Sequence, residues 1–341
     1  MSIHPSILEC RSVGKVYSAQ VRGAGTLGIL RGFVRRQVRE HVALANIDLA
    51  VAPGEIVGLI GANGAGKTTL VKCLTGIIPA SSGRCELFGH DAFALTRADK
   101  RRLSLVMGQR SQLWWDIPAI DSFRLLREIY QVDAARFERR VREQAERLDV
   151  TDRLQVQLRQ LSLGERMKME IIGAFLHDPE VVFLDEPTIG LDLLSQETIR
   201  TFLREVNRER RTTVILTSHD MADIEETCDR LVILEAGRIL FDGDLVGLRR
   251  RFVGRRAVEV HLEANSRPWS AELDGELERF GAVLVREAPR ALTFEVDAEH
   301  CQPFIQHLFD LFQVRDLAVE RQPLENLIRE IFRTGELVEA S

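Results

Sequence analysis

The stretch GLIGANGAGKTTLVK, residues 58–72, constrains the fold of this chain most strongly, because it gathers four glycines around a lysine and two threonines. Glycine is costly inside regular structure, so such a cluster indicates a loop that needs bare backbone. An apolar run that reads as a buried strand, residues 55–61, precedes the loop, and a predicted helix begins near Lys67. In that context the pattern G-x-x-x-x-G-K-[ST] predicts a phosphate-binding loop, with its fixed positions at Gly61, Gly66, Lys67 and Thr68.

The residue types of this loop suit a polyphosphate. Phosphates carry several negative charges in a small volume, and consecutive backbone N–H groups surround them only where no Cβ intrudes, which explains glycine at 61, 64 and 66. The helix that follows adds the positive end of its dipole. Lys67 offers a compact charge to the β- and γ-phosphates, and Thr68 offers a hydroxyl to Mg²⁺. The alternative, a glycine-rich turn beside an unrelated lysine, leaves the flanking strand and helix unexplained.

A second apolar run, VVFLDEP at residues 181–187, ends in two adjacent acids. Carboxylates at the end of a buried strand are unfavourable unless a cation compensates their charge. We expect Asp185 to hold Mg²⁺ together with Thr68. We expect Glu186 to orient an attacking water or to take its proton. Taken alone, the acidic pair could equally cap a helix before Pro187.

The remaining pattern of the first 245 residues indicates an α/β fold. Buried runs at 55–61, 181–187 and 212–220 alternate with helical segments, which is typical of a parallel sheet covered on both faces. Residues 7–17 read as a strand that opens a sheet. Residues of about 96–177 have a mostly helical pattern, so we expect a helical subdomain inserted between strands of the sheet.

Two arginine-rich segments interrupt this pattern. The first belongs to an insertion at about residues 18–42, in which residues 27–38 place apolar residues and arginines at roughly helical spacing. It reads either as a surface helix docked on the sheet or as a contact with anionic lipid or a membrane partner. The second segment, residues 246–256, reads as a solvated linker. Beyond it the order β-α-β-β-α-β predicts a small ferredoxin-like α+β domain in residues 257–341.

Composition and charge argue against several classes of protein. The net charge of −5 disfavours a general nucleic-acid binder. No run approaches the roughly 20 apolar residues that a membrane-spanning helix needs, and the N-terminus does not read as a secretion signal. The five scattered cysteines indicate reduced thiols rather than disulfides or a zinc site. We therefore expect a cytosolic protein that meets a membrane only through a partner.

Three further segments carry polar residues at expected element ends. Ser162 and Gly164, in LSLGE, begin a predicted helix and offer a second anion-binding helix end, although serine is a common cap. Gln109 follows a predicted strand, where its amide could reach metal or water. His219 ends the third buried run, where an imidazole N–H could meet a γ-phosphate, although a lone histidine there is more often structural.

Together and in this order, the motifs resemble the nucleotide-binding subunit of an ABC transporter over about residues 7–245. The resemblance implies a P-loop cassette in residues 1–245, with a parallel core sheet, an antiparallel β subdomain and an inserted helical subdomain. It implies that Tyr17 stacks on adenine, and that Gln109, Asp192 and His219 are the Q-loop, D-loop and switch residues. Asp185 and Glu186 then belong to the Walker B strand. The Walker A loop GANGAGKTT supplies the ATP-binding residues Gly61, Asn63, Gly64, Ala65, Gly66, Lys67, Thr68 and Thr69.

The segment LSLGE departs from the usual signature L-S-G-G-Q at Leu163 and Glu165, and it keeps the two residues that face phosphate, Ser162 and Gly164. The resemblance implies a head-to-tail dimer of two copies of the chain. Each ATP is then held by the Walker loops of one copy and by the signature helix of the other. Closure and hydrolysis drive an integral membrane permease, with Mg²⁺ as the metal.

The overall pattern resembles exporters of drugs, polysaccharides and lipids, whose ATPase and membrane subunits are separate chains. This implies an ATPase at the cytoplasmic face of the inner membrane. Trp114 and Trp115 either contact the membrane partner or belong to the core. Two other functions remain as alternatives. One is an ABC-type ATPase that acts on ribosomes or DNA, which the single cassette and acidic charge disfavour. The other is a regulator without turnover, which Glu186 and His219 disfavour.

Overall fold

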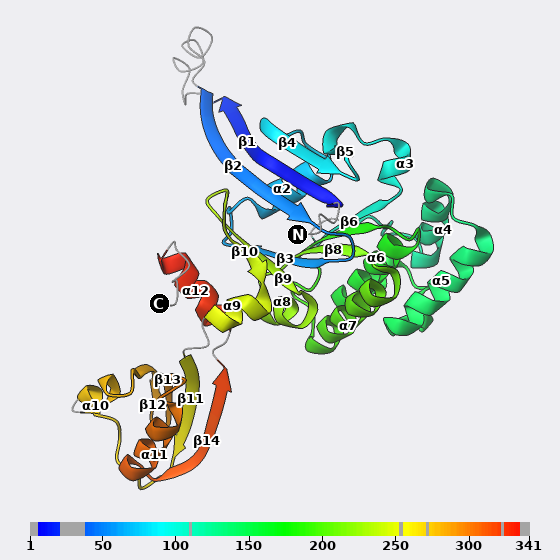
Figure 1. Cartoon of the computed structure of the whole chain (residues 1–341). Helices are drawn as coiled ribbons and strands as arrows, with labels where there is room; N and C mark the ends of the chain where they lie inside the picture. Colours follow the sequence, from blue (N-terminus) through cyan, green and yellow to red (C-terminus); the bar gives the residue numbers. More distant parts are fainter. Residues whose placement is uncertain are drawn as a thin grey trace, which may run out of the picture. The chain divides into compact units, whose positions relative to one another are not determined.

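A computed structural model describes residues 6–20, 38–108, 111–251, 255–270, 273–321 and 324–334 of the chain (Figure 1). The chain divides into two compact units, Met1–Asp244 and Leu245–Ser341. The first unit contains a six-stranded and a four-stranded sheet, and the second contains a four-stranded sheet of its own. None of the helices in the described ranges is both long and apolar enough to span a bilayer.

The central sheet of the first unit has the strand order β10 (Arg238–Asp244), β9 (Arg230–Glu235), β3 (Ile56–Gly61), β8 (Thr213–Thr217), β7 (Val181–Asp185) and β6 (Leu103–Met107). Neighbouring strands are parallel except β10 and β9. The inner strands β3, β7 and β8 are buried along nearly their whole length. This is the parallel sheet that the apolar runs predict, because strands covered on both faces need apolar side chains at every position.

The carboxyl ends of β3, β7 and β8 meet at one edge of the central sheet. The register pairs Asp185 at the end of β7 with Thr217 at the end of β8, and Thr217 is in turn level with Leu59 of β3. The chain leaves these strands towards α2 (Lys67–Leu74), α7 (Leu193–Arg210) and α8 (Met221–Thr227). Ligands of open parallel sheets bind at this edge, so the fold gathers three of the predicted motifs where a ligand is expected.

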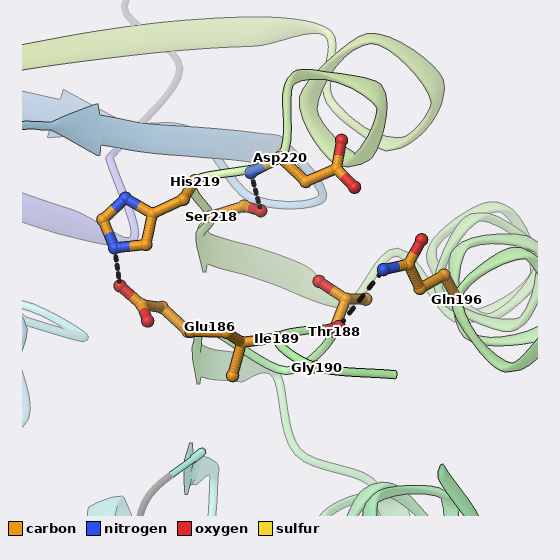
Figure 2. Close-up of a pocket in the computed structure, with 8 residues that line it drawn as sticks. All are labelled: Glu186, Thr188, Ile189, Gly190, Gln196, Ser218, His219 and Asp220. Carbon is orange, nitrogen blue, oxygen red and sulfur yellow. Dashed lines mark hydrogen bonds and ion pairs between the residues drawn. The ribbon is translucent and has the colours of Figure 1, made fainter. Parts of the chain in front are cut away.

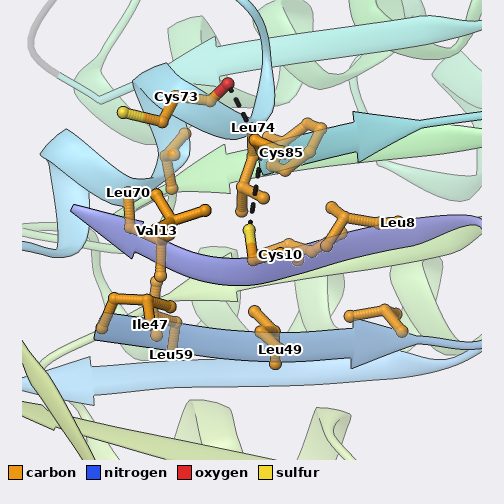
Figure 3. Packing of buried hydrophobic residues seen from close by; sticks show 14 of the residues in the cluster. Leu8, Cys10, Val13, Ile47, Leu49, Leu59, Leu70, Cys73, Leu74 and Cys85 are labelled. Atoms are coloured by element: carbon orange, nitrogen blue, oxygen red, sulfur yellow. Dashed lines mark hydrogen bonds between the residues drawn. The ribbon is translucent and has the colours of Figure 1, made fainter. Parts of the chain in front are cut away.

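An antiparallel sheet with the order β2 (Val38–Val51), β1 (Leu8–Gln20), β4 (Ser82–Leu87) and β5 (His90–Asp91) completes the β structure of the first unit. Its apolar side chains share one core with α2 and β3. Figure 3 shows Cys10 and Cys85 facing each other in this core, with their sulfurs 3.5 Å apart. All five cysteines of the chain are free and buried. Burial raises the pKa of Cys73 to about 11, which keeps its thiol protonated at neutral pH.

The predicted basic helix at residues 27–38 lies outside the described residues except for Val38, which begins β2. Both ends of the predicted insertion at 18–42 are paired strand residues. Ser18 pairs with Glu40, and Tyr17 pairs with His41. The strand pair β1–β2 therefore extends well beyond the part of it that the sequence pattern indicates.

Helices follow β5 and fill most of the chain between β6 and β7. They are α3 (Arg97–Lys100), α4 (Ala119–Tyr130), α5 (Ala134–Arg147) and α6 (Leu163–Phe175), with short 3-10 turns at Ala92–Ala94, Thr151–Arg153 and Leu158–Gln160. Phe123 of α4 and Phe175 of α6 are fully buried. The ring of Phe175 meets Phe202 of α7 edge-on, with centroids 5.4 Å apart. Aromatic packing thus fixes α6 against α7, the helix that follows β7.

The second unit follows the predicted β-α-β-β-α-β order. Its elements are β11 (Arg255–Leu262), α10 (Asp274–Glu278), β12 (Val283–Ala288), β13 (Ala291–Asp297), α11 (Cys301–Leu311) and β14 (Val314–Arg321). The antiparallel strand order is β12-β13-β11-β14. Val258, Phe294 and Phe304 lie in its apolar core. Two more helices belong to this unit, α9 (Leu245–Arg251) and α12 (Leu324–Thr334); α9 occupies the first part of the predicted linker.

Candidate functional site

The glycine-rich loop runs from the end of β3 to the start of α2, and its glycines meet different constraints. A Cβ on Gly61 would lie 2.3 Å from the carbonyl oxygen of Leu234, so close packing against β9 requires glycine there. Gly66 has φ +108°, and its Cβ would lie 2.7 Å from the Ala43 carbonyl oxygen. Gly64 has φ +84° but no described atom within 4 Å of its Cβ position. The loop is therefore held against two strands at its ends and is open in its middle.

Helix α2 begins at Lys67, after Gly66 in a left-handed conformation. Because Gly66 has no side chain with which to cap the helix, the first backbone N–H groups of α2 are available to an anion. The Lys67 ammonium donates to the Gly61 carbonyl at 2.6 Å, so the lysine lies along the loop that it closes. Burial lowers the pKa of Lys67, and the carboxylates of Glu186 and Asp185 oppose this shift.

A cavity of about 560 Å³ opens over the loop. Tyr17 and His41, which pair across β1 and β2, line this cavity. Glu186 and His219 line it too. The cavity can hold an aromatic base between the strand pair and the loop, with a polyphosphate chain on the loop itself. Its lining includes Asn63, Gly64, Ala65, Gly66, Lys67, Thr68 and Thr69.

Hydrogen bonds join the ends of β7 and β8 beside this cavity. The Thr68 hydroxyl donates to Asp185 Oδ2 at 3.4 Å, and the Thr217 hydroxyl donates to Asp185 Oδ1 at 2.7 Å. The Glu186 N–H donates to both the carbonyl and the hydroxyl of Thr217, at 3.1 and 3.0 Å. Glu186 itself has φ +55°, a left-handed conformation that is uncommon for a residue with a side chain. Such strain persists only where the surroundings hold it.

The Glu186 carboxylate and the His219 imidazole are in direct contact, with Oε1 and Nε2 2.5 Å apart (Figure 2). They come from different strands, since Glu186 follows β7 and His219 follows β8. Both line the cavity over the loop, and both also line a second cavity of about 260 Å³ beside it. The Glu186 carboxylate, which can act as a base, and the His219 imidazole therefore lie next to the glycine-rich loop. A base and an N–H donor beside a polyphosphate suit attack by water on its terminal phosphate.

The LSLGE segment forms the start of α6, away from this cavity. Ser162 caps the helix by accepting from the Glu165 N–H at 3.2 Å, and the Ser162 N–H donates to Glu165 Oε2 at 2.8 Å. Arg153 pairs with Glu165 at 2.9 Å. The backbone N–H of Ser162 contributes most to lowering the pKa of Glu165. Glu165 therefore closes a capping box, while the neighbouring Leu163 side chain is exposed.

Asp192 lies beside the start of α6. Its carboxylate caps α7 by accepting from the Ser195 N–H at 2.9 Å and from the Ser195 hydroxyl at 2.8 Å. A Cβ on Gly164 would lie 2.5 Å from the Ser195 hydroxyl and 3.3 Å from Asp192 Oδ2. Glycine at 164 thus allows α6 to approach the beginning of α7 closely, which forms a second group of predicted site residues.

The structure gathers most of the predicted residues into these two groups. Gln109 lies outside the described residues. Sequence reasoning missed two side chains at the first group, His41 and Thr217. His41 lies within the predicted basic insertion at 18–42, and its pairing with Tyr17 becomes visible only in the strand register. Thr217 has a weak signal in the sequence, since it is a hydroxyl at the end of an otherwise apolar run just before Ser218 and His219.

Comparisons with known proteins agree on one family. The family model described as "ABC transporter" matches residues 44–189. The Nod factor export ATP-binding protein I of Cupriavidus metallidurans is 33% identical over 229 residues, which cover 67% of this chain and 75% of that protein. The methionine import ATP-binding protein MetN of Corynebacterium efficiens is 31% identical over 221 residues, which cover 64% and 62%. A solved structure, described as that of an ATP-binding subunit of an ABC transporter, superposes with a TM-score of 0.60 at 26% identity, covering 72% of this chain and 93% of that one.

Proposed function

The chain belongs to the ABC transporter family as an ATP-binding and ATP-hydrolysing subunit that powers a membrane transporter, and we propose that it drives export through a separate permease. The observation that carries the mechanism is the Glu186–His219 pair beside the phosphate-binding loop. In this proposal ATP lies in the cavity of about 560 Å³, with adenine against Tyr17 and the phosphates on residues 61–69. His41, which pairs with Tyr17, is a further candidate contact for the nucleoside.

The residues at the loop also fit Mg²⁺. Magnesium is usually bound through one or two carboxylates and by substrate phosphates and water, rather than by a full set of protein ligands. Thr68 and Asp185 offer a hydroxyl and a carboxylate that are 3.4 Å apart at the phosphate end of the cavity. Thr217 holds the other oxygen of Asp185 and so fixes the orientation of the carboxylate. When bound, the ion supplies positive charge to the phosphate oxygens. Gln109 is a further candidate ligand.

Hydrolysis in this proposal needs positioning and charge rather than covalent catalysis. Glu186 orients the attacking water and accepts its proton. His219 donates an N–H towards the γ-phosphate, and the contact of its imidazole with the Glu186 carboxylate places both side chains at the same end of the cavity. Lys67 and the N–H groups at the start of α2 stabilise the negative charge of the phosphates.

We propose that two copies of the chain close head to tail over ATP. Ser162 and Gly164 at the start of α6, with Asp192 nearby, form the surface that meets the nucleotide of the other copy. The apolar residues around them support an interface, because Leu163, Leu193 and Leu194 are 43%, 80% and 75% exposed. A protein surface with several large exposed apolar side chains at one place marks a contact site.

The permease contact is proposed for the loop before α4. Trp114 and Trp115 are 46% and 50% exposed, so the alternative that both belong to the core is wrong. Arg166 of α6 lies over the ring of Trp115 at 4.9 Å, which connects this loop to the helix of the LSLGE segment. Tryptophan is enriched at the centres of protein interfaces. This contact would hold the chain at the cytoplasmic face of the inner membrane.

Export is proposed over import on two grounds: the resemblance to the exporter subgroup, and the relative whose name specifies Nod factor export. The methionine import relative is almost equally similar, so the direction needs its own experiment. Co-purification of the full chain with a polytopic membrane protein, followed by transport assays in inverted and right-side-out vesicles, tests both partner and direction. Recovery of ribosomes or DNA in place of a membrane protein would favour the alternative function.

The substitution Glu186→Gln tests the catalytic assignment. The variant should bind ATP as the wild type does, lose steady-state hydrolysis by about 100-fold or more, and accumulate as an ATP-bound dimer. The matched control is Glu138→Gln, an exposed residue of α5, which should retain wild-type turnover. Phosphate release and size-exclusion chromatography with ATP measure these outcomes. Undiminished hydrolysis by Glu186→Gln would remove Glu186 from its proposed role.

A further inference from the structure

Asp223 of α8 is a fully buried carboxylate that lies outside the proposed catalytic pair. The hydroxyls of Thr188 and Ser218 both donate to its Oδ2, the latter at 2.6 Å. Arg200 of α7 donates from Nε to its Oδ1 at 2.7 Å. A buried carboxylate is tolerated only where its charge is paired and its oxygens accept hydrogen bonds. Arg200 supplies the charge, and the two hydroxyls supply further hydrogen bonds.

The two hydroxyls belong to the segments that carry the catalytic pair. Thr188 lies two residues after Glu186, and Ser218 immediately precedes His219, as Figure 2 shows. Thr188 and Ser218 are themselves almost completely buried. One carboxylate oxygen of Asp223 is therefore a common anchor for two segments that leave different strands.

The anchoring leaves the residues between these points little freedom. Ser218 Oγ accepts from the Asp220 N–H at 3.0 Å, and Asp220 Oδ1 accepts from the Ala222 N–H at 2.9 Å. The residues on both sides of His219 are thus held by hydrogen bonds, Ser218 through its hydroxyl and Asp220 through its N–H. Thr217 of β8 accepts from the Glu186 N–H, and Thr188, two residues after Glu186, is anchored to Asp223. These contacts hold the left-handed backbone of Glu186 in place.

We propose that Asp223 is a positioning residue for ATP hydrolysis, which sets the distance and orientation of Glu186 and His219 through Thr188 and Ser218. It acts through these two hydroxyls and does not line the nucleotide cavity. The inference rests on the proposed catalytic roles of Glu186 and His219. The competing explanation is that the cluster only holds α7 against α8, since Arg200 also pairs with Glu226 of α8 at 3.3 Å.

The variants Thr188→Val and Ser218→Ala remove one anchor each and leave the Arg200–Asp223 pair in place. In the full chain with Mg²⁺ and ATP, each should lower kcat by about 10- to 100-fold, because misplacement of a catalytic group by about 1 Å has effects of that size. The KM for ATP should stay at the wild-type value, since the nucleotide contacts are untouched. Thr188→Ser keeps the hydroxyl and should recover most of the lost kcat.

Thr227→Val is the matched control. Thr227 also lies in α8 and is buried, but its hydroxyl has no hydrogen-bond partner in the described part of the chain. This substitution should leave kcat unchanged.

Wild-type kcat in both Thr188→Val and Ser218→Ala would overturn the inference, as would failure of Thr188→Ser to recover activity. A loss of kcat that merely follows a loss of Tm would also overturn it. If Glu186→Gln remained active, the proposed catalytic assignment itself would fail; if Glu186→Gln is inactive while both anchor variants are fully active, only the inference fails.

Discussion

At the scale of single residues, substitutions can distinguish the two constraints on the loop glycines, which are close packing and a left-handed backbone. Gly66→Ala should weaken ATP binding by about tenfold or more and lower the free energy of unfolding by about 1–3 kcal/mol, because its Cβ would meet the Ala43 carbonyl and its φ is +108°. Gly64→Ala introduces backbone strain but no clash, so it should lower the free energy of unfolding by only about 1 kcal/mol. Urea unfolding and calorimetric titration with ATP measure both effects. An unchanged urea midpoint for Gly66→Ala would contradict the packing argument.

The sequence predicts which residues of the loop face phosphate, because its pattern, strand and helix occur together within about fifteen residues. It does not predict Thr217 as the partner of Asp185. That contact depends on the alignment of β7 with β8, which lie far apart in the sequence. The same reasoning applies to His41, whose place beside Tyr17 depends on the pairing of β1 with β2. Residue identity can be read locally, whereas a partner across a sheet requires the register.

At the scale of elements, the capping box at the start of α6 gives a pH-dependent prediction. The pKa of Glu165 is lowered in the folded chain, first by the Ser162 N–H. Its stabilising effect is therefore present above the ordinary glutamate pKa of 4.5 and is lost as the pH falls through the lower folded value. Glu165→Gln should lower the free energy of unfolding by about 0.5 kcal/mol at pH 7, because it removes a charge at a helix N-terminus, and this difference should disappear in acid.

Urea unfolding of wild type and Glu165→Gln over a series of pH values measures this difference. A difference that stays constant from pH 7 into acid would mean that packing, rather than charge, stabilises this helix start. Gln still offers the side-chain oxygen that a capping box needs, so the helix itself should persist in the variant. Circular dichroism checks this point.

Among the elements, the buried strands of the central sheet are predictable because each is an uninterrupted apolar run. The structure of the arginine-rich stretch at 246–256 is harder to predict. Its first part forms α9, since leucine and arginine are both good helix formers and a charge run alone does not exclude a helix. The long strands β1 and β2 likewise include the ends of the predicted basic insertion at 18–42. Cross-strand pairing stabilises these residues as strand although their local pattern is not that of a strand.

At the scale of the whole molecule, the two units have separate apolar cores. The first unit carries the nucleotide cavity, and the second has its own sheet with the aromatic side chains Phe294 and Phe304 at its centre. The order of strands and helices in the second unit can be predicted from the sequence, because each segment has a clear strand or helix pattern. Its role is not readable, since its sequence shows no site chemistry.

Separate cores predict separate unfolding transitions. Phe294 is fully buried and packs edge-on against Trp269 and Phe304, with ring centroids 5.2 Å apart in each case. Phe294→Ala should therefore destabilise the second unit by about 3–5 kcal/mol through lost burial and a cavity. Phe202→Ala, at a fully buried position of α7, is the matched substitution in the first unit.

Differential scanning calorimetry of the full chain, with and without Mg²⁺ and ATP, separates the two effects. Nucleotide binds only the folded first unit, so it should raise the transition that Phe202→Ala lowers and leave unchanged the transition that Phe294→Ala lowers. Phe294→Ala should also retain wild-type ATP affinity, because its side chain lies in the other core. A single transition that responds to nucleotide and to both substitutions would mean that the two units unfold together, and the second unit would then contribute directly to the stability of the ATP site.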